Sequence, residues 1–344
     1  MFDLYRAVRP LLFTIPPEAA HAAALAALNI SNWLGLIASP VETASSVDLF
    51  GLKFPNRLGV AAGLDKNGVA IDALGQLGFG FVEVGTVTPT AQPGNARPRL
   101  FRLRDDEALI NRMGFPNSGV AALIEKLKRR TYRGMCGVNI GKNAQTPLSD
   151  AATDYLACLT AVYDYADYVA INVSSPNTID LRSLQDRDAL FPLLATLLAA
   201  RHSLRRERNR SVPILLKLTV DLSDRLGSDR RDGLLDAVKV ARESGVDGII
   251  LSNTTTSRAA LRYSGEEIGG LSGRPLMNRT REAIQRIRAD VSTTFPIIGV
   301  GGIASATDAI DFRRAGADLL QIYTGLVYRG PALIGQVLSS LANE

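Results

Sequence analysis

The chain has 344 residues, 46% of them hydrophobic and 21% charged, with a net charge of +5. This composition indicates a folded protein, and the length fits two ordinary domains or one large α/β barrel with additions. No stretch interleaves basic and aromatic residues, so we expect no nucleic-acid partner. The two cysteines, Cys136 and Cys158, suit neither a disulfide framework nor a metal site, which indicates a reducing, cytosolic setting without a metal.

The amino terminus predicts two helices. Apolar residues recur at helical spacing in the first, at Leu4, Val8, Leu11 and Leu12. After Pro16 and Pro17, residues 19–41 carry no formal charge, a length that could span a bilayer. Low hydrophobicity and interspersed polar residues argue against a span. We expect residues 1–42 to lie on a membrane surface or around an apolar pocket, the alternative being a helical cap on the main domain.

Targeting signals are not evident at this end of the chain. The uncharged stretch begins too late for a secretory signal peptide, and the basic region before it is weak. An arginine- and serine-rich transit segment is also missing, which favours a bacterial protein. The densest basic run, residues 201–210, we interpret as a solvated helix end and loop rather than a lipid-attracting patch.

Eight short apolar runs alternate with helical patterns from residue 58 onward. They cover residues 58–63, 80–87, 136–141, 168–174, 214–219, 248–253, 296–302 and 319–325. Such alternation predicts a parallel sheet, and eight strands close a barrel, so we predict an α/β fold with a (β/α)8 TIM barrel over residues 43–344. A doubly wound open sheet is less favoured, because no strand leads into a GxGxxG turn. Residues 88–135 must hold more than a single crossover helix, as an insertion above the barrel mouth.

Polar residues gather at the predicted carboxyl ends of these strands, which a barrel brings together around one mouth. The segments GVGGIAS and IYTG, after the seventh and eighth strands, lie where barrels commonly bind phosphate, which favours a phosphate-bearing cofactor. Lys217 lies within the apolar run ILLKLT, where a cation needs an anion beside it. That anion is either the N1/O2 edge of a flavin or a carboxylate in the barrel core.

Ser175, in the segment INVSSPNT, poses the question of a serine hydrolase. A Ser-His-Asp triad needs a histidine near the serine. The chain has only His21, in the amino-terminal segment, and His202, in the basic run. The segment also lacks the GxSxG pattern, so we do not expect a hydrolase.

A series of motifs, in order over residues 61–325, resembles the dihydroorotate dehydrogenase family. The motifs are AAGLDKNG, VGTVTP, PRLFRL, NRMGF, VNIGKN, INVSSPNT, LKLT, NTT, GLSGRPL, IIGVGGI and QIYTG. The resemblance implies an FMN-dependent barrel that oxidises dihydroorotate to orotate in pyrimidine biosynthesis. Within the family, the chain resembles the quinone-dependent, membrane-associated class 2, because it has serine rather than cysteine at the base position and carries a helical extension. That class implies peripheral association with the cytoplasmic side of the bacterial inner membrane.

The resemblance also implies roles for individual residues. Ser175 would be the catalytic base, and His21 and Arg102 would line a quinone tunnel. FMN would be held by Ala61, Ala62, Gly63, Leu64, Asp65, Thr86, Asn139, Asn172, Lys217, Ser252, Gly273, Gly302, Tyr323 and Thr324. Dihydroorotate would be held by Lys66, Asn111, Arg112, Met113, Gly114, Phe115, Asn172, Asn177, Asn253 and Thr254.

These residue types suit the chemistry. Orotate is a flat pyrimidine dione with a carboxylate, so Lys66 supplies a cation, and the asparagine amides each supply a donor and an acceptor. A serine hydroxyl is a weak base, so its proton must pass onward, through water held by Thr178 and the backbone near Phe115. Two alternatives stay open: another FMN barrel acting on a reduced pyrimidine, such as a tRNA dihydrouridine synthase, and a membrane-associated flavin-binding or phosphate-binding protein without turnover.

Overall fold

The computed structural model describes residues 4–37, 46–224, 232–262 and 265–344. Eight parallel strands form a closed barrel, in which each strand neighbours the next along the chain and the last neighbours the first. They are β3 (Leu58–Val60), β4 (Phe81–Val87), β7 (Met135–Ile140), β8 (Tyr168–Asn172), β9 (Ile214–Leu218), β10 (Gly248–Leu251), β12 (Ile297–Val300) and β13 (Leu319–Ile322). The predicted (β/α)8 barrel is confirmed. Most strands end before the predicted runs do, because the polar residues at the ends belong to loops.

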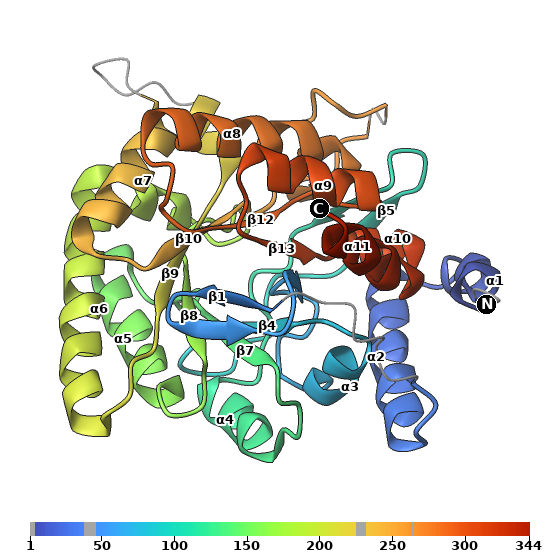
Figure 1. The fold of residues 1–344 in the computed structure, drawn as a ribbon, viewed down its shortest axis with the longest axis horizontal. Helices are drawn as coiled ribbons and strands as arrows, with labels where there is room; N and C mark the ends of the chain where they lie inside the picture. The colour runs from blue at the N-terminus through green and yellow to red at the C-terminus, as the bar shows by residue number, and fades with distance from the viewer. Residues whose placement is uncertain (1–3, 38–45, 225–231, 263–264) are drawn as a thin grey trace.

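Helices form an outer layer around the barrel (Figure 1). They are α3 (Ile71–Gln76), α4 (Val120–Arg129), α5 (Ala151–Val162), α6 (Arg187–Arg208), α7 (Gly233–Ser244), α8 (Met277–Asp290), α9 (Ala306–Ala315), α10 (Thr324–Arg329) and α11 (Ala332–Ala342). Short 3₁₀ helices occur in the loops: η1 (Leu148–Asp150), η2 (Leu181–Gln185), η3 (Val220–Asp224) and η4 (Arg274–Leu276).

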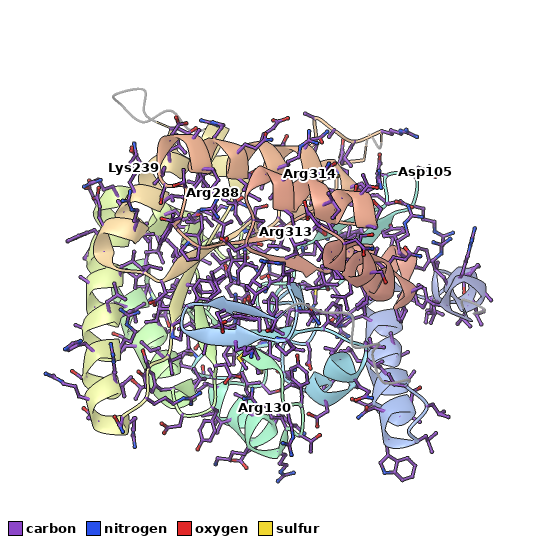
Figure 2. All side chains as sticks on the ribbon, viewed as in Figure 1. Asp105, Arg130, Lys239, Arg288, Arg313 and Arg314 are labelled. Atoms are coloured by element: carbon purple, nitrogen blue, oxygen red, sulfur yellow. The ribbon has the colours of Figure 1, made fainter. Side chains whose placement is uncertain are left out.

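Helix α7 illustrates why these segments are helical. Its buried residues recur at i, i+3, i+4 and i+7, from Leu234 to Ala241, while Lys239 is exposed on the outer layer (Figure 2). The Asp232 side chain accepts hydrogen bonds from the first backbone N–H groups, and Gly245 ends the helix with a φ of 90°. The apolar stripe therefore faces the barrel, and both helix ends are satisfied.

The amino-terminal end of the barrel is filled with side chains. Phe81, Tyr168 and Ile250 belong to a buried cluster inside it, together with Phe54 from the hairpin of β1 (Val47–Leu49) and β2 (Leu52–Phe54). A side chain at Gly137 would meet the Tyr168 ring, so the packing requires glycine there. Among the described residues, side chains therefore close this end, and the pocket described below opens at the carboxyl end.

The insertion between β4 and β7 holds one crossover helix, α4, together with a hairpin of β5 (Leu100–Leu103) and β6 (Ala108–Asn111). Strand β6 also pairs with β11 (Gly270–Gly273), which follows β10, so three antiparallel strands form a separate sheet. Residues Asn111 and Gly273 of this sheet line the barrel-mouth pocket described below. The predicted insertion above the mouth is therefore confirmed.

The amino-terminal extension forms two helices, α1 (Leu4–Leu12) and α2 (Pro17–Trp33), which lie together at one side of the barrel (Figure 1). Helix α1 is attached by Tyr5 and Arg9, which donate to backbone carbonyls at the carboxyl end of α10. Helix α2 packs against α3 and β5. No helix in the described ranges is long and apolar enough to cross a membrane. The predicted domain boundary at residues 42 and 43 falls outside the described residues.

Candidate active site

A pocket opens at the carboxyl ends of the barrel strands, and most of the predicted site residues line it. Those in its wall are His21, Ala61, Ala62, Gly63, Lys66, Thr86, Asn111, Met113, Gly114, Phe115, Asn172, Ser175, Asn177, Lys217, Ser252, Asn253, Thr254, Gly273, Gly302, Tyr323 and Thr324. They come from the ends of different barrel strands and the loops that follow, from the insertion and, for His21, from α2. The barrel therefore brings together residues that are far apart in the sequence.

Some of the predicted site residues lie outside this wall. Asn139 is buried behind Thr86, whose hydroxyl donates to its Oδ1 over 2.5 Å. The Asp65 carboxylate accepts the backbone N–H groups of Val69 and Ala70, at 2.9 and 2.7 Å, and so organises the loop before α3. Arg112 is directed to the Pro98 carbonyl, 2.9 Å away. Leu64 lines a second cavity instead, together with Asp65.

Hydrogen bonds orient the asparagine amides that line the pocket, in two separate groups. Asn172 Nδ2 donates to Thr86 Oγ1 over 2.9 Å, and Asn253 Nδ2 donates to Asn172 Oδ1 over 3.1 Å. Asn177 Nδ2 donates to Asn111 Oδ1 over 3.0 Å, which links the loop after β8 to the insertion. Each amide that lines the pocket is thus oriented by a neighbour before any ligand arrives.

A carboxylate in the barrel core was one of the two anions expected beside Lys217, but the sequence did not identify Glu83 as that acid. Glu83, on β4, is fully buried and accepts hydrogen bonds from Asn139 Nδ2 (2.9 Å), Tyr168 OH (2.9 Å) and Gln321 Nε2 (2.8 Å). Its Oε1 lies 3.6 Å from Lys217 Nζ, so the structure contains the carboxylate partner considered as the alternative for this lysine. Burial and the Glu83 carboxylate raise the pKa of Tyr168 well above its usual value, which keeps the phenol a donor. The position of Glu83 within the apolar run GFVEVGTV could have indicated a buried acid. No comparable sequence signal indicated a role for Gln321.

Ser175 lies just beyond β8 and is 5% exposed. Its Oγ accepts the backbone N–H of Asn177 over 3.2 Å. Nearby in sequence, the buried Thr178 Oγ1 has no hydrogen-bond partner within the described part of the chain. The Phe115 carbonyl already accepts from Gln92 Nε2 (3.2 Å) and Asn117 Nδ2 (2.9 Å). Of the two predicted relay groups, the Thr178 hydroxyl therefore has more capacity left for a water.

Lys66 and His21 are two titratable residues in the wall of the pocket. The Lys66 ammonium donates to the Gly63 carbonyl over 2.8 Å. Burial, with a contribution from the Arg99 charge, lowers the pKa of Lys66 to about 8. Burial and the Lys66 charge lower the pKa of His21 to about 4, so this imidazole is neutral at physiological pH.

A second cavity, of about 890 Å³, lies between α2 and the barrel. Its wall includes Pro17, Ala22, Leu25 and Ala26 of α2. It shares wall residues with the barrel-mouth pocket, so the two spaces adjoin: Glu18, His21, Lys66, Leu100 and Met113.

Arg102, predicted beside His21, is in neither wall. Its guanidinium donates to the Ile15 carbonyl over 2.9 Å and lies 4.7 Å from the Phe13 ring centroid. Both residues belong to the segment that joins α1 to α2. In this structure, Arg102 holds that segment against the barrel, and only His21 of the predicted pair lines a cavity.

The family model for dihydroorotate dehydrogenase matches residues 44–344. The chain belongs to the dihydroorotate dehydrogenase family. Among its relatives, the dihydroorotate dehydrogenase (quinone) of Chromobacterium violaceum is 47% identical over 98% of both chains, and that of Leptothrix cholodnii is 48% identical over 98% of both. The ferulenol complex of the Eimeria tenella dihydroorotate dehydrogenase has a TM-score of 0.86 at 35% identity, covering 98% of this chain and 94% of that one.

Proposed function

We propose that this protein oxidises dihydroorotate to orotate, with FMN as hydride acceptor and a membrane quinone as final electron acceptor, in pyrimidine biosynthesis. One observation carries the proposal. A cation, a row of oriented amides and a buried serine line the same pocket, and that pocket adjoins an apolar cavity under α2. The family and its quinone-dependent relatives support the same conclusion.

The residues at the barrel mouth fit FMN. Gly301 and Gly302 have φ values of 136° and 90°, and a side chain on Gly302 would collide with Met277, so the backbone here requires glycine. Without side chains, the backbone N–H groups of this turn are open to an anion such as a phosphate. Gln321 Oε1 is buried without a hydrogen-bond partner among the described residues, which suits a ligand N–H. We infer that Gly273, Gly302, Tyr323 and Thr324 would hold the phosphate, and that Thr86, Asn172 and Lys217 would hold the ring. Asn139 lies behind them and orients Thr86 and Asn172 by hydrogen bonds. When bound, FMN accepts the hydride from C6 of the substrate.

The remaining residues bind and deprotonate the substrate. We assign the carboxylate of dihydroorotate to Lys66 and its ring to Asn111, Asn172, Asn177 and Asn253, because their amides line the pocket and are held in place. Ser175 removes the proton from C5. Burial of Ser175 excludes bulk water, and Thr178, with its unsatisfied hydroxyl, is the group to which we assign the water that takes the proton onward.

The quinone is assigned to the cavity under α2, where His21 lines the wall. Large apolar side chains of the extension are exposed to solvent: Val8, Leu11, Ile15, Ile30, Trp33, Leu34 and Leu36. Such a group suits insertion into the surface of a bilayer, so we infer peripheral membrane association through the amino-terminal helices. A bacterial inner membrane, on its cytoplasmic side, is the location that this inference favours.

The acceptor profile of the purified protein tests the proposal. We expect a yellow protein that dihydroorotate bleaches under anaerobic conditions and that a short-chain quinone reoxidises rapidly. Fumarate and NAD, as matched acceptors, should give little turnover. Turnover with fumarate or NAD alone would refute the quinone assignment, and a flavin that dihydroorotate does not bleach would refute the substrate.

A further inference from the structure

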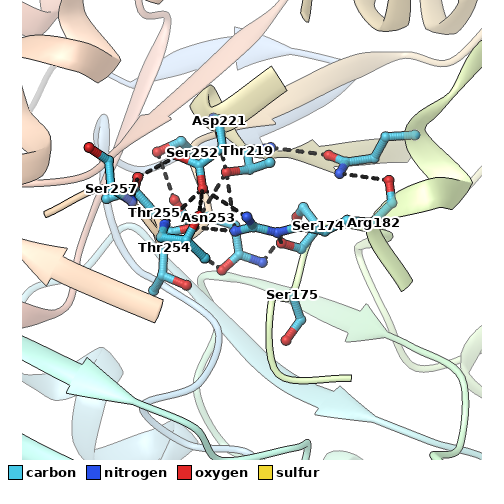
Figure 3. Close-up of polar contacts among 12 residues, drawn as sticks. Ser174, Ser175, Arg182, Thr219, Asp221, Ser252, Asn253, Thr254, Thr255 and Ser257 are labelled. Carbon is cyan, nitrogen blue, oxygen red and sulfur yellow. Dashed lines mark hydrogen bonds and ion pairs between the residues drawn. The ribbon is translucent and has the colours of Figure 1, made fainter. Parts of the chain in front are cut away.

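Behind the pocket wall, one guanidinium joins three loops (Figure 3). Arg182 lies in η2, within the loop that carries Ser175. Its Nε donates to the Ser174 carbonyl (3.1 Å), its Nη1 to Asp221 Oδ2 (2.7 Å) and its Nη2 to the Thr254 carbonyl (2.7 Å). These partners belong to the loops after β8, β9 and β10. We call Arg182, Ser174, Asp221 and Thr254 the Arg182 network.

The network acts directly on residues that line the pocket. The bond to Ser174 closes the segment 175–181, and Ser175 is the first residue of that segment. The bond to Thr254 fixes the loop in which Asn253 and Thr254 line the pocket wall. On the pocket side the same two loops meet again, because Asn253 Nδ2 donates to Ser174 Oγ over 3.0 Å.

Asp221 holds the guanidinium in place from behind. Its carboxylate accepts the Thr255 hydroxyl, and it also accepts the Thr256 N–H over 2.8 Å. The Arg182 and Asp221 side chains are 13% and 11% exposed, so this ion pair is largely shielded from water. Burial tends to raise the pKa of the Asp221 carboxyl. The hydrogen bonds and the Arg182 charge outweigh burial and lower this pKa, so the carboxyl stays ionised.

We propose that Arg182 is a positioning residue for catalysis: it sets the place of the Ser175 base relative to the substrate amides of the loop after β10. The inference rests on the proposed function. Arg182 does not line the pocket, so it acts through Ser175 and Asn253 rather than on the substrate. Its planar fork supplies three nitrogens in fixed directions, which a lysine cannot reproduce.

The test uses the FMN-loaded enzyme and anaerobic reduction of the flavin by dihydroorotate across about pH 6 to 9. Arg182→Ala should retain FMN and lose on the order of 100-fold in reduction rate near neutral pH, as expected for a small misplacement of reacting groups. The deficit should shrink as pH rises, because hydroxide replaces a misplaced base. Arg182→Lys should restore thermal stability but not the rate. It also keeps the test usable if the alanine variant folds poorly.

A double-mutant comparison separates positioning from a structural role. Ser175→Ala alone should keep FMN and lose most of the reduction rate near neutral pH, and adding Arg182→Lys should cost less than about threefold more. Arg130→Ala is the matched control. Arg130 pairs with Asp167 over 3.0 Å at similar exposure, near the amino-terminal end of β8, and its loss should leave the rate unchanged.

Several results would overturn the inference. They are a wild-type rate in Arg182→Lys, a deficit that is constant with pH, or full additivity with Ser175→Ala. A wild-type protein that dihydroorotate does not bleach would overturn both this inference and the proposed function. Normal wild-type reduction with unaffected Arg182 variants would overturn this inference alone.

Discussion

At the scale of single residues, the proposed base has no strong partner of its own. Ser175 Oγ accepts one backbone N–H, and the two histidines of the chain are not bonded to it in the described structure. Its reactivity must therefore come from where it is held and from where its proton can go. Thr178 offers an unused hydroxyl for the proton path, and the Arg182 network fixes the loop. The protein compensates for a weak base by positioning it.

Lys66 makes substrate binding depend on pH. Its pKa of about 8 in the free protein means that the ammonium is charged at neutral pH and is lost above pH 8. We expect the dissociation constant of orotate to be flat below about pH 7 and to rise above pH 8, approaching tenfold per pH unit. Titration of the flavin absorbance with orotate measures this constant.

Lys66→Arg is the control for this dependence, because a guanidinium stays charged throughout the range. Its orotate affinity should be weaker than that of the wild type, owing to the different shape, but constant with pH. An unchanged wild-type affinity up to about pH 10 would contradict the assignment of Lys66 to the carboxylate.

The sequence could predict those site residues that follow the end of a barrel strand. Ser175, Lys66 and Asn253 follow strand ends, and a barrel gathers strand ends at one mouth. Glu83 and Gln321 meet because β4 and β13 lie on either side of β3 in the closed barrel and both side chains are buried, and Arg182 works through backbone carbonyls of other loops. Sequence spacing carries no information on such contacts. Arg102 was assigned to a tunnel by resemblance, yet the packing of Phe13 and Ile15 engages it elsewhere.

At the scale of elements, α2 forms a wall of the second cavity while adding little to the barrel mouth. Ala22 lines this cavity, whereas Ala27, one and a half turns along the same helix and also exposed, does not. The pair therefore offers a matched comparison on one helix. The amino-terminal pattern predicted the helix correctly, but alanine spacing could not tell which alanines face the cavity.

We expect Ala22→Trp to fill part of the cavity and to lower the rate of quinone reduction about tenfold or more, with the rate of flavin reduction by dihydroorotate unchanged. Ala27→Trp should leave both rates unchanged. Separate measurement of the two half-reactions by stopped-flow absorbance provides the comparison. Equal effects of the two substitutions, or a loss in the dihydroorotate step, would contradict the quinone assignment.

At the scale of the whole molecule, the exposed apolar side chains are concentrated on one side. Trp33 is 83% exposed and Leu36 is 71% exposed, close to the end of α2. If this side contacts a bilayer, Trp33→Ser with Leu36→Ser should lower partitioning onto anionic phospholipid vesicles by about tenfold or more, because each buried apolar side chain contributes about 1.5–3 kcal/mol. Vesicle flotation measures the bound fraction.

Phe191→Ser is the matched control, since this side chain is 55% exposed on α6, on the far side of the barrel from α2 (Figure 1). It should leave partitioning unchanged. The double variant should also keep its activity with a soluble quinone, because the cavity wall is intact. Equal vesicle binding by all variants would argue against membrane contact through the helices.

The shared wall between the two cavities has a consequence for drug resistance. A compound lodged under α2 touches Ala22, Leu25 and Ala26 on one side and Lys66, Leu100 and Met113 on the other. Substitutions at Lys66 would harm the proposed carboxylate contact, whereas those at Ala22, Leu25 or Ala26 of α2 change side chains that do not line the substrate pocket. We expect escape variants selected with such a compound to accumulate in α2, and compounds that anchor on the barrel side of this wall to select resistance more slowly.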